Sequence, residues 1–169
     1  MFNRLCLSLL FILFSSPVIM AQQGGNTPAP SALYAELGAN AGLSLNLDQI
    51  FYTNDGGFKS SFRLGAGVIP IKLNGVTSVI PTVPLELLGF YGKANKHFEF
   101  GGGYTHHFSG NPSVTNSYLT GRLGFRYQNL KGGNLFRFSI IPLLYKDHDS
   151  IAPGLTLSPG FGVSYGRSF

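Results

Sequence analysis

The sequence predicts an all-β fold in which eight antiparallel strands, connected up and down, close into a transmembrane β-barrel. Three observations carry this prediction: an export signal at the start, eight segments with two-residue alternation, and a last segment that runs to Phe169. In that last segment, Phe, Tyr, Val and Leu of one parity alternate with Gly, Ser and Thr of the other. Alternation with a period of two is typical of a β-strand with one apolar face.

The N-terminal residues 1–21 are predicted to be a signal peptide. Arg4 supplies the positive charge, residues 5–14 form the apolar run, and Ala21 ends a plausible cleavage site. The run is shorter than the roughly 20 apolar residues that a membrane-spanning helix needs. Cys6, the only cysteine, precedes the run, so we expect neither a lipid anchor nor a disulfide in the exported chain.

The exported chain is predicted to have two parts. Residues 22–31 read as a flexible periplasmic linker, because they are polar and carry Gly and Pro, and residues 32–169 form one barrel domain. Only 11% of the chain is charged, while 14% is aromatic and 23 residues are Gly. The net charge of +5 comes from scattered basic residues, so we expect no nucleic-acid partner.

The eight predicted strands have the roughly 9–11 residues of a tilted membrane strand, or slightly more. They cover residues 32–40, 43–52, 58–69, 81–92, 97–108, 116–129, 134–145 and 154–169. Between the first two, a three-residue loop over 40–42 would pair Ala39 with Leu43 and place a Gly in its third position. One unbroken strand over residues 32–52 remains the alternative.

The connections alternate in length, which is typical of outer-membrane barrels with both termini in the periplasm. Short periplasmic turns are predicted at residues 54–57, 93–96 and 131–134, and longer extracellular loops at 70–80, 109–115 and 146–153. Residues 76–80 have β propensity, which would allow the strands to extend above the membrane there and offer an edge to partners.

Aromatic side chains on the apolar parity gather at the periplasmic ends of the strands, as in the aromatic girdle of a membrane interface. These residues are Phe51, Phe58, Tyr91, Phe98, Tyr127, Phe136 and Phe169. A soluble sandwich would instead bury its aromatics in mid-strand, so the pattern favours lipid outside the barrel.

The charges lie on the opposite parity, which therefore faces the barrel interior. They are Glu36, Lys59, Arg63, Glu86, Glu99, Arg122, Arg126 and Arg137. A Lys or Arg that faces lipid at mid-bilayer costs about 2–4 kcal/mol, whereas inside an eight-stranded barrel it can pair. The sequence predicts an interior network of three carboxylates and five cations, and no continuous aqueous pore.

Several motifs resemble small outer-membrane barrel proteins of Bacteroidota-type bacteria. They are Ser44-Leu45-Asn46-Leu47-Asp48, Pro84-Leu85-Glu86, the stretch from Gly121 to Gln128, and Phe136-Arg137. The architecture is similar to OmpA/OmpX-type barrels. The resemblance implies an outer-membrane location, contact with membrane lipid and lipopolysaccharide, assembly through the C-terminal strand by the barrel-assembly machinery, and a monomer. Arg167 departs from the hydrophobic residue that is usual at that position.

One short motif suggests catalysis. His107-Phe108-Ser109 resembles the His-x-Ser of lipid A deacylase barrels, which implies His107 as the base and Ser109 as the nucleophile. The orienting acid is missing at suitable spacing, because the next acidic residue is Asp147. We therefore expect no catalysis, with a lipid A-modifying acyl hydrolase as the alternative.

Other chemistry finds less support in the sequence. A metal site could join a His of the pair at 106–107 to Asp147, His148 and Asp149, although adjacent strand residues face opposite sides. No cofactor motif is present, and we expect neither a cofactor nor a metal. A small barrel that binds one apolar ligand at its mouth is disfavoured by the charges in its interior. The sequence favours a structural or surface-interaction role.

Overall fold

The computed structural model describes residues 29–73, 75–110, 116–129, 132–146 and 154–169. The predicted signal peptide and most of the predicted linker lie outside these residues. The strands are β1 (Ser31–Gly38), β2 (Gly42–Thr53), β3 (Phe58–Leu73), β4 (Val76–Lys93), β5 (Lys96–His107), β6 (Ser117–Gln128), β7 (Gly133–Ile140), β8 (Leu143–Lys146), β9 (Leu155–Ser158) and β10 (Phe161–Ser168).

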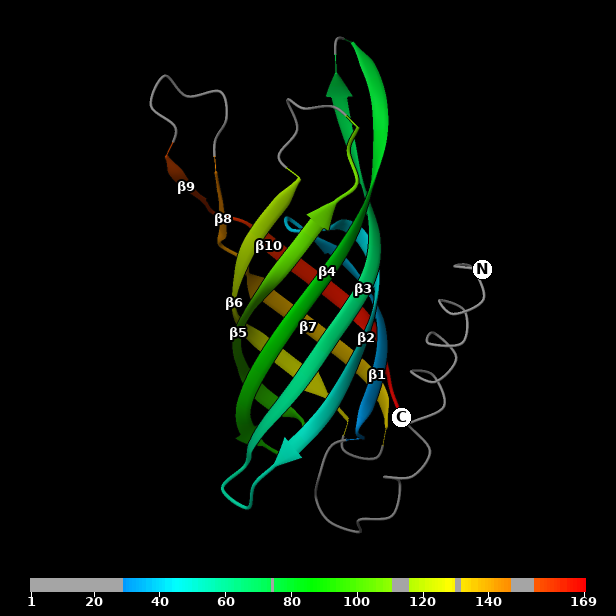
Figure 1. Ribbon diagram of the computed structural model, residues 1–169. Coiled ribbons are helices and arrows are strands. Elements are labelled where there is room, and N and C mark those ends of the chain that lie inside the picture. Colours follow the sequence, from blue (N-terminus) through cyan, green and yellow to red (C-terminus); the bar gives the residue numbers. More distant parts are fainter. Residues whose placement is uncertain (1–28, 74, 111–115, 130–131, 147–153) are drawn as a thin grey trace, which may run out of the picture.

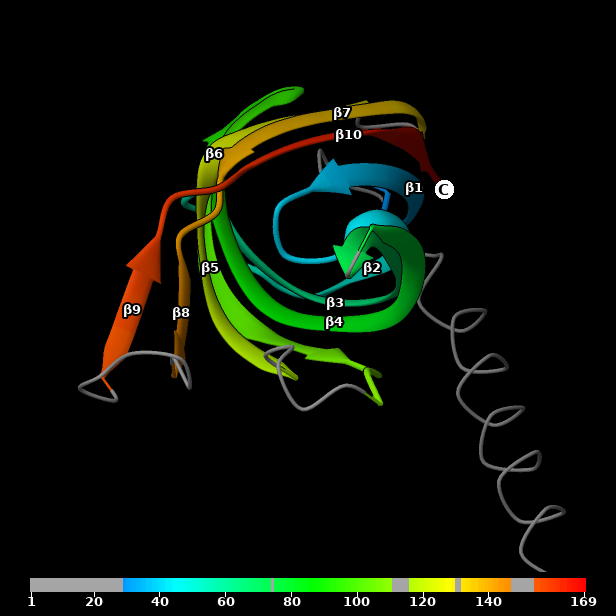
Figure 2. The ribbon, with the colours of Figure 1, turned by 90° about the horizontal axis from the view of Figure 1, so that it is seen from above.

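These strands form a closed antiparallel barrel of eight strands with up-and-down connections, as the sequence predicted. Each strand from β1 to β7 pairs with the next, and β10 closes the ring between β7 and β1 (Figures 1 and 2). Closure leaves no open sheet edge around the barrel wall.

Two of the barrel strands are interrupted by prolines. The ladder between β7 and β10 pairs Ile140 with Phe161, and the ladder between β8 and β9 continues in the same register with Leu143 opposite Ser158. Pro142 and Pro159 lie in the breaks, where a missing backbone N–H interrupts the ladder. The pairs β7 with β8 and β9 with β10 therefore each make one strand of the eight.

The two ends of the barrel differ. We call the end with the tight turns near residues 54–57 and 94–95 the turn end, and the opposite end the loop end (Figure 1). β1 begins and β10 finishes at the turn end. β1 begins at Ser31, one residue earlier than predicted, and the carbonyl of Pro30 already accepts from the Ile50 amide at 2.7 Å.

The predicted first hairpin is present, but its register differs by two residues. Gly38 pairs with Gly42, so residues 39–41 form the loop, and Ala39 does not pair with Leu43. Gly42 has φ of 65°, the left-handed region that Gly enters without strain, and a Cβ at this position would clash with the Val68 carbonyl oxygen. The turn then bends into the barrel, where Asn40 and Ala41 are buried.

The prediction of a loop over residues 70–80 is wrong, because β3 and β4 extend into this range. Pro70 pairs with Val79 and Leu73 with Val76, so the hairpin rises beyond its neighbours (Figure 1). The β propensity of residues 76–80, noted from the sequence, explains the extension.

The barrel wall reverses the burial pattern of a soluble protein, because its outer face exposes apolar side chains and its inner face buries charged ones. Leu37 is 68% exposed and Phe161 61% exposed on the outer face, while Arg63 and Arg126 are fully buried on the inner face. Within the part of the chain that is described, no helix has the length and apolar character needed to span a membrane.

Candidate functional site: the charged lumen

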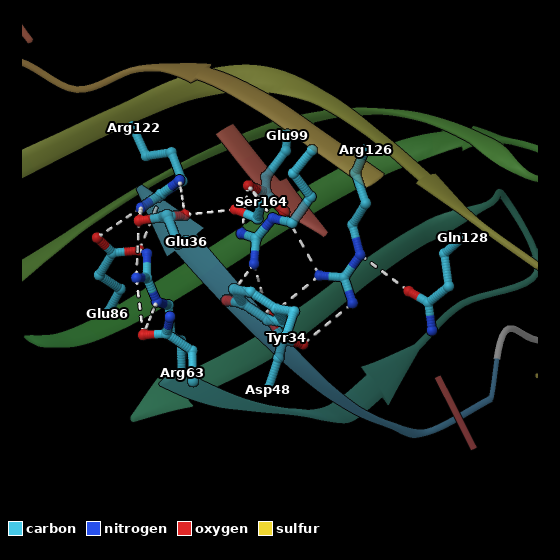
Figure 3. A network of polar contacts seen from close by, with 12 residues as sticks. Tyr34, Glu36, Asp48, Arg63, Glu86, Glu99, Arg122, Arg126, Gln128 and Ser164 are labelled. Carbon is cyan, nitrogen blue, oxygen red and sulfur yellow. Dashed lines mark hydrogen bonds and ion pairs between the residues drawn. The ribbon is translucent and has the colours of Figure 1, made fainter. Parts of the chain in front are cut away.

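Eight charged side chains fill the middle of the barrel and are fully buried there (Figure 3). They are Glu36, Asp48, Arg63, Glu86, Glu99, Arg122, Arg126 and Arg137. Their strands alternate side chains between the two faces, and each of these residues lies on the face that the ladder turns inward. Four carboxylates therefore meet four guanidinium groups in one enclosed space.

The loop-side cluster comprises Glu36, Arg63, Glu86 and Arg122, and each arginine contacts both carboxylates. Arg63 lies 2.8 Å from an oxygen of each carboxylate. Arg122 reaches across the lumen from β6 and contacts Glu36 at 2.9 Å and Glu86 at 2.8 Å. The formal charges of this cluster cancel.

The turn-side cluster comprises Asp48, Glu99, Arg126 and Arg137, and its arginines also contact both carboxylates. Arg126 lies 3.1 Å from Asp48 and 3.4 Å from Glu99. Arg137 lies 3.5 Å from Asp48 and donates from Nε to Glu99 at 3.2 Å. This cluster is also formally neutral, and its distances are more varied.

Two aromatic side chains accompany the turn-side cluster inside the barrel. The Arg126 guanidinium lies 4.3 Å from the centre of the Phe90 ring, and that of Arg137 lies 4.8 Å from the Tyr34 ring. Arg137 also donates to the Tyr34 hydroxyl. Because Arg63 lies 5.7 Å from the same ring, Tyr34 sits between the two clusters (Figure 3).

Neutral polar side chains complete the hydrogen bonding of the loop-side cluster. Asn46 accepts from Arg63 at 2.8 Å, and its amide occupies the space that a side chain at Gly65 would fill. Ser164 of β10 donates to Glu36 at 2.6 Å, and Arg122 donates to Ser139 at 3.1 Å. With Ser164 included, every one of the eight barrel strands supplies a side chain to the network.

Chain segments cross the lumen at both ends of β1. At the loop end, Asn40 donates from Nδ2 to Glu86 at 3.0 Å, and Thr82 donates to the Ala41 carbonyl at 3.0 Å. At the turn end, Gln128 donates to the Ala29 carbonyl at 2.8 Å and accepts from Arg126 at 2.8 Å. Polar contacts thus line the lumen along the whole length of β1, with the Tyr34 ring between the two clusters.

Seven of the eight residues predicted for the interior network lie in these clusters. Lys59, the fifth predicted cation, lies apart from them and donates to the Gly57 carbonyl at 3.3 Å. Sequence reasoning missed Asp48, although its parity in β2 matches that of the inward-facing Ser44 and Asn46. With Asp48 included and Lys59 left out, the two clusters together contain four carboxylates and four guanidinium groups.

The predicted interface aromatics lie on the outer face at the turn end. Phe51, Tyr91, Phe98, Phe136 and Phe169 are exposed, while Phe58 and Tyr127 are half-buried. The register of β2 against β3 shifts between Ile50 and Tyr52, so Phe51 is the extra residue of a β-bulge.

The predicted catalytic pair lies at the loop end of β5. His107 points inward, is 5% exposed, and its Nε2 lies 3.1 Å from the Asn40 carbonyl oxygen. A carbonyl only accepts, so Nε2 carries the proton and the lone pair of a neutral imidazole is at Nδ1. Ser109 follows the strand, and its amide donates to the His107 carbonyl at 3.1 Å.

Metal-binding groups do not gather in the described ranges, where no three His, Cys, Asp or Glu side chains could hold a metal ion together. Asp147, His148 and Asp149, named above for a metal site, lie outside the described residues. Inside the barrel, each carboxylate of the two clusters forms ion pairs with two arginines.

No protein-family model matches this chain, and no curated protein or solved structure is significantly similar to it.

Proposed function

We propose that this protein is an integral outer-membrane β-barrel with a structural or surface-interaction role. One observation carries the proposal: large apolar side chains are exposed around the wall, while the charges are buried inside. Exposed examples come from β1, β2, β4, β6 and β10, namely Leu37, Leu43, Leu87, Leu119 and Phe161.

This distribution is unfavourable in water and favourable in lipid. Each Å² of apolar surface exposed to water costs roughly 25 cal/mol, and soluble monomers rarely expose contiguous apolar patches above a few hundred Å². In a bilayer the same surface is solvated by acyl chains, and the closed ring pairs the strands with one another instead of exposing a sheet edge to lipid. The exposed aromatics at the turn end suit an interface with the periplasm.

The proposed orientation places the turn end in the periplasm and the loop end outside. The resemblance to Bacteroidota-type barrels supports an outer membrane that contains lipopolysaccharide, and assembly of a monomer by the barrel-assembly machinery. The neutral ion-pair clusters fill the lumen, and we assign them a structural role.

The sharpest test compares two arginine substitutions on one face of β4. Leu87 is 60% exposed on the barrel wall, and Val79 is 61% exposed on the hairpin beyond it. We expect Leu87→Arg to cost about 2–4 kcal/mol of folding free energy in bilayers and to reduce outer-membrane insertion. Val79→Arg, the matched control, should insert like the wild type.

Insertion is measured by cell fractionation, and folding by the shift in gel migration between heated and unheated samples. Equal insertion of both variants, or a wild type recovered in the soluble fraction, would remove the proposal. Equal loss in both variants would mean that the hairpin is also surrounded by lipid, which contradicts the proposed orientation.

A lipid A-modifying acyl hydrolase is the second candidate, favoured by the fixed tautomer of His107. The Asn40 carbonyl orients this imidazole and keeps a lone pair at Nδ1, as a general base requires. The lipid A acyl pattern is compared by mass spectrometry in hosts that express the wild type or Ser109→Ala. A Ser109-dependent loss of an acyl chain would establish the enzyme, and an unchanged pattern with correctly inserted protein would exclude it.

A further inference from the structure

The hairpin of β3 and β4 extends beyond the strands on both sides of it. Pairing of β3 with β2 stops at Val68, and pairing of β4 with β5 stops at Thr82, after which the Phe108 amide donates to the Pro81 carbonyl at 2.9 Å. Among the described residues, the segments 69–73 and 76–80 pair only with each other. Each segment therefore has an outer edge, meaning the side of the strand that does not pair with the other segment of the hairpin.

The direction of the backbone groups on β4 follows from the bond at Pro81. Its carbonyl points toward the β5 side, and in a strand every second residue directs its N–H and C=O the same way. Thr77 and Val79 therefore direct their backbone groups to the outer edge of β4. The edge keeps two N–H donors and two acceptors, with no proline and no charge over residues 76–80.

The outer edge of β3 is protected by contrast. Pro70 lies directly opposite Val79, and Lys72 lies opposite Thr77, so these two residues face the β3 edge. Pro70 has no N–H to offer, and an edge Lys keeps other strands away. Within the described ranges, the hairpin thus has one blocked edge and one open edge.

We propose that the open edge of β4, residues 76–80, binds an extended segment of a partner protein by β-strand addition. The partner strand would satisfy the backbone groups of Thr77 and Val79 and would carry uncharged, β-branched side chains opposite them. This inference rests on the proposed function in one respect, namely that the loop end faces the exterior. Two copies in one membrane point their hairpins the same way, whereas a separate segment can pair in either direction.

The test uses the folded full chain in lipid nanodiscs and a labelled synthetic peptide. The peptide alternates Val and Thr, is capped, and has one Lys at each end for solubility. We expect Val79→Pro, which removes an edge donor without breaking a bond to β3, to weaken peptide binding by about tenfold. Val79→Thr keeps the donor and should bind like the wild type.

A second variant tests the blocked edge. Pro70→Val combined with Lys72→Thr restores a donor and removes the charge, so we expect two peptides per barrel instead of one. Binding is followed by fluorescence anisotropy, and stoichiometry by native mass spectrometry.

The inference is overturned if the folded wild type binds no peptide, or if Val79→Pro binds as well as Val79→Thr. Dimerisation of the wild type that Val79→Pro abolishes would also overturn it, in favour of a second copy. Folding is read separately from heat-dependent gel migration. Peptide binding by a purified barrel that does not fractionate with the outer membrane would remove the proposed function alone.

Discussion

The two ion-pair clusters of the lumen have the same composition but different surroundings. In the loop-side cluster, Asn46, Asn40, Ser139 and Ser164 complete the hydrogen bonds of the charged groups. In the turn-side cluster, the rings of Phe90 and Tyr34 lie against the guanidinium groups. The loop-side cluster is completed by small polar side chains, whereas the turn-side cluster, besides hydrogen bonds to Gln128 and the Tyr34 hydroxyl, is packed against aromatic faces.

This difference shows two ways to hold arginine in an enclosed space. Small polar residues satisfy the remaining N–H groups and oxygens, so removal of one partner leaves a buried group without a bond. Aromatic faces attract the cation through the ring quadrupole and exclude water, which gives a smaller and less directional stabilisation. We therefore expect the loop-side cluster to be more sensitive to single substitutions.

The largest effect is expected from Glu86→Gln. Arg63 and Arg122 would then share the single charge of Glu36, and breaking a buried pair costs about 3–5 kcal/mol. The free energy of unfolding is measured by urea titration of the barrel in detergent or bilayers. Glu99→Gln makes the same change in the turn-side cluster, and a larger loss there would reverse the comparison.

A smaller effect is expected from Ser164→Ala. The serine hydroxyl donates to Glu36 at 2.6 Å, and a hydrogen bond to a charged group contributes about 1.5–3 kcal/mol. The same urea titration measures the loss. Ser168→Ala is a control on the same strand, because its hydroxyl donates to the Gly133 carbonyl at 3.4 Å and not to a charge. Equal losses in the two variants would show that Ser164 contributes nothing to the cluster.

The smallest effect is expected from Phe90→Leu in the turn-side cluster. The substitution keeps an apolar side chain and removes the ring beside Arg126, so a loss of about 1 kcal/mol is expected. Leu88→Met, on the same inner face of β4, controls for a change of shape without a ring. A loss above that of Glu86→Gln would mean that aromatic packing is the stronger support.

The sequence predicted which side chains face the inside and the outside of the barrel wall, because the parity of a residue in its strand is a local property. Two-residue alternation assigned the seven predicted interior charges and the outward aromatics to opposite faces, and the structure places them there. The eight strands and the presence of the first hairpin were also predicted correctly, although the register of that hairpin was not. Asp48 could have been found from the parity of its strand.

Other features depend on contacts that are distant in the sequence. At Gly42 the chain passes so close to the Val68 carbonyl of β3 that a Cβ would clash, and the extension of β3 requires β4 to continue opposite. The pairing of Arg122 with Glu36 joins residues on opposite walls, so it depends on closure of the whole ring. No local pattern contains that information.

The shared lumen network also sets the size of the barrel. Every strand contributes a side chain, and each neutral cluster takes its four charges from four different strands. Deletion of β1 and β2 would leave the four guanidinium groups with only Glu86 and Glu99, and deletion of β3 and β4 would leave Glu36 and Arg122 with one ionic partner each. An added hairpin would give a wider interior that these side chains could not bridge. The ion pairs across the lumen therefore favour a ring of eight strands, and they make folding cooperative because they join strands that are distant in the sequence.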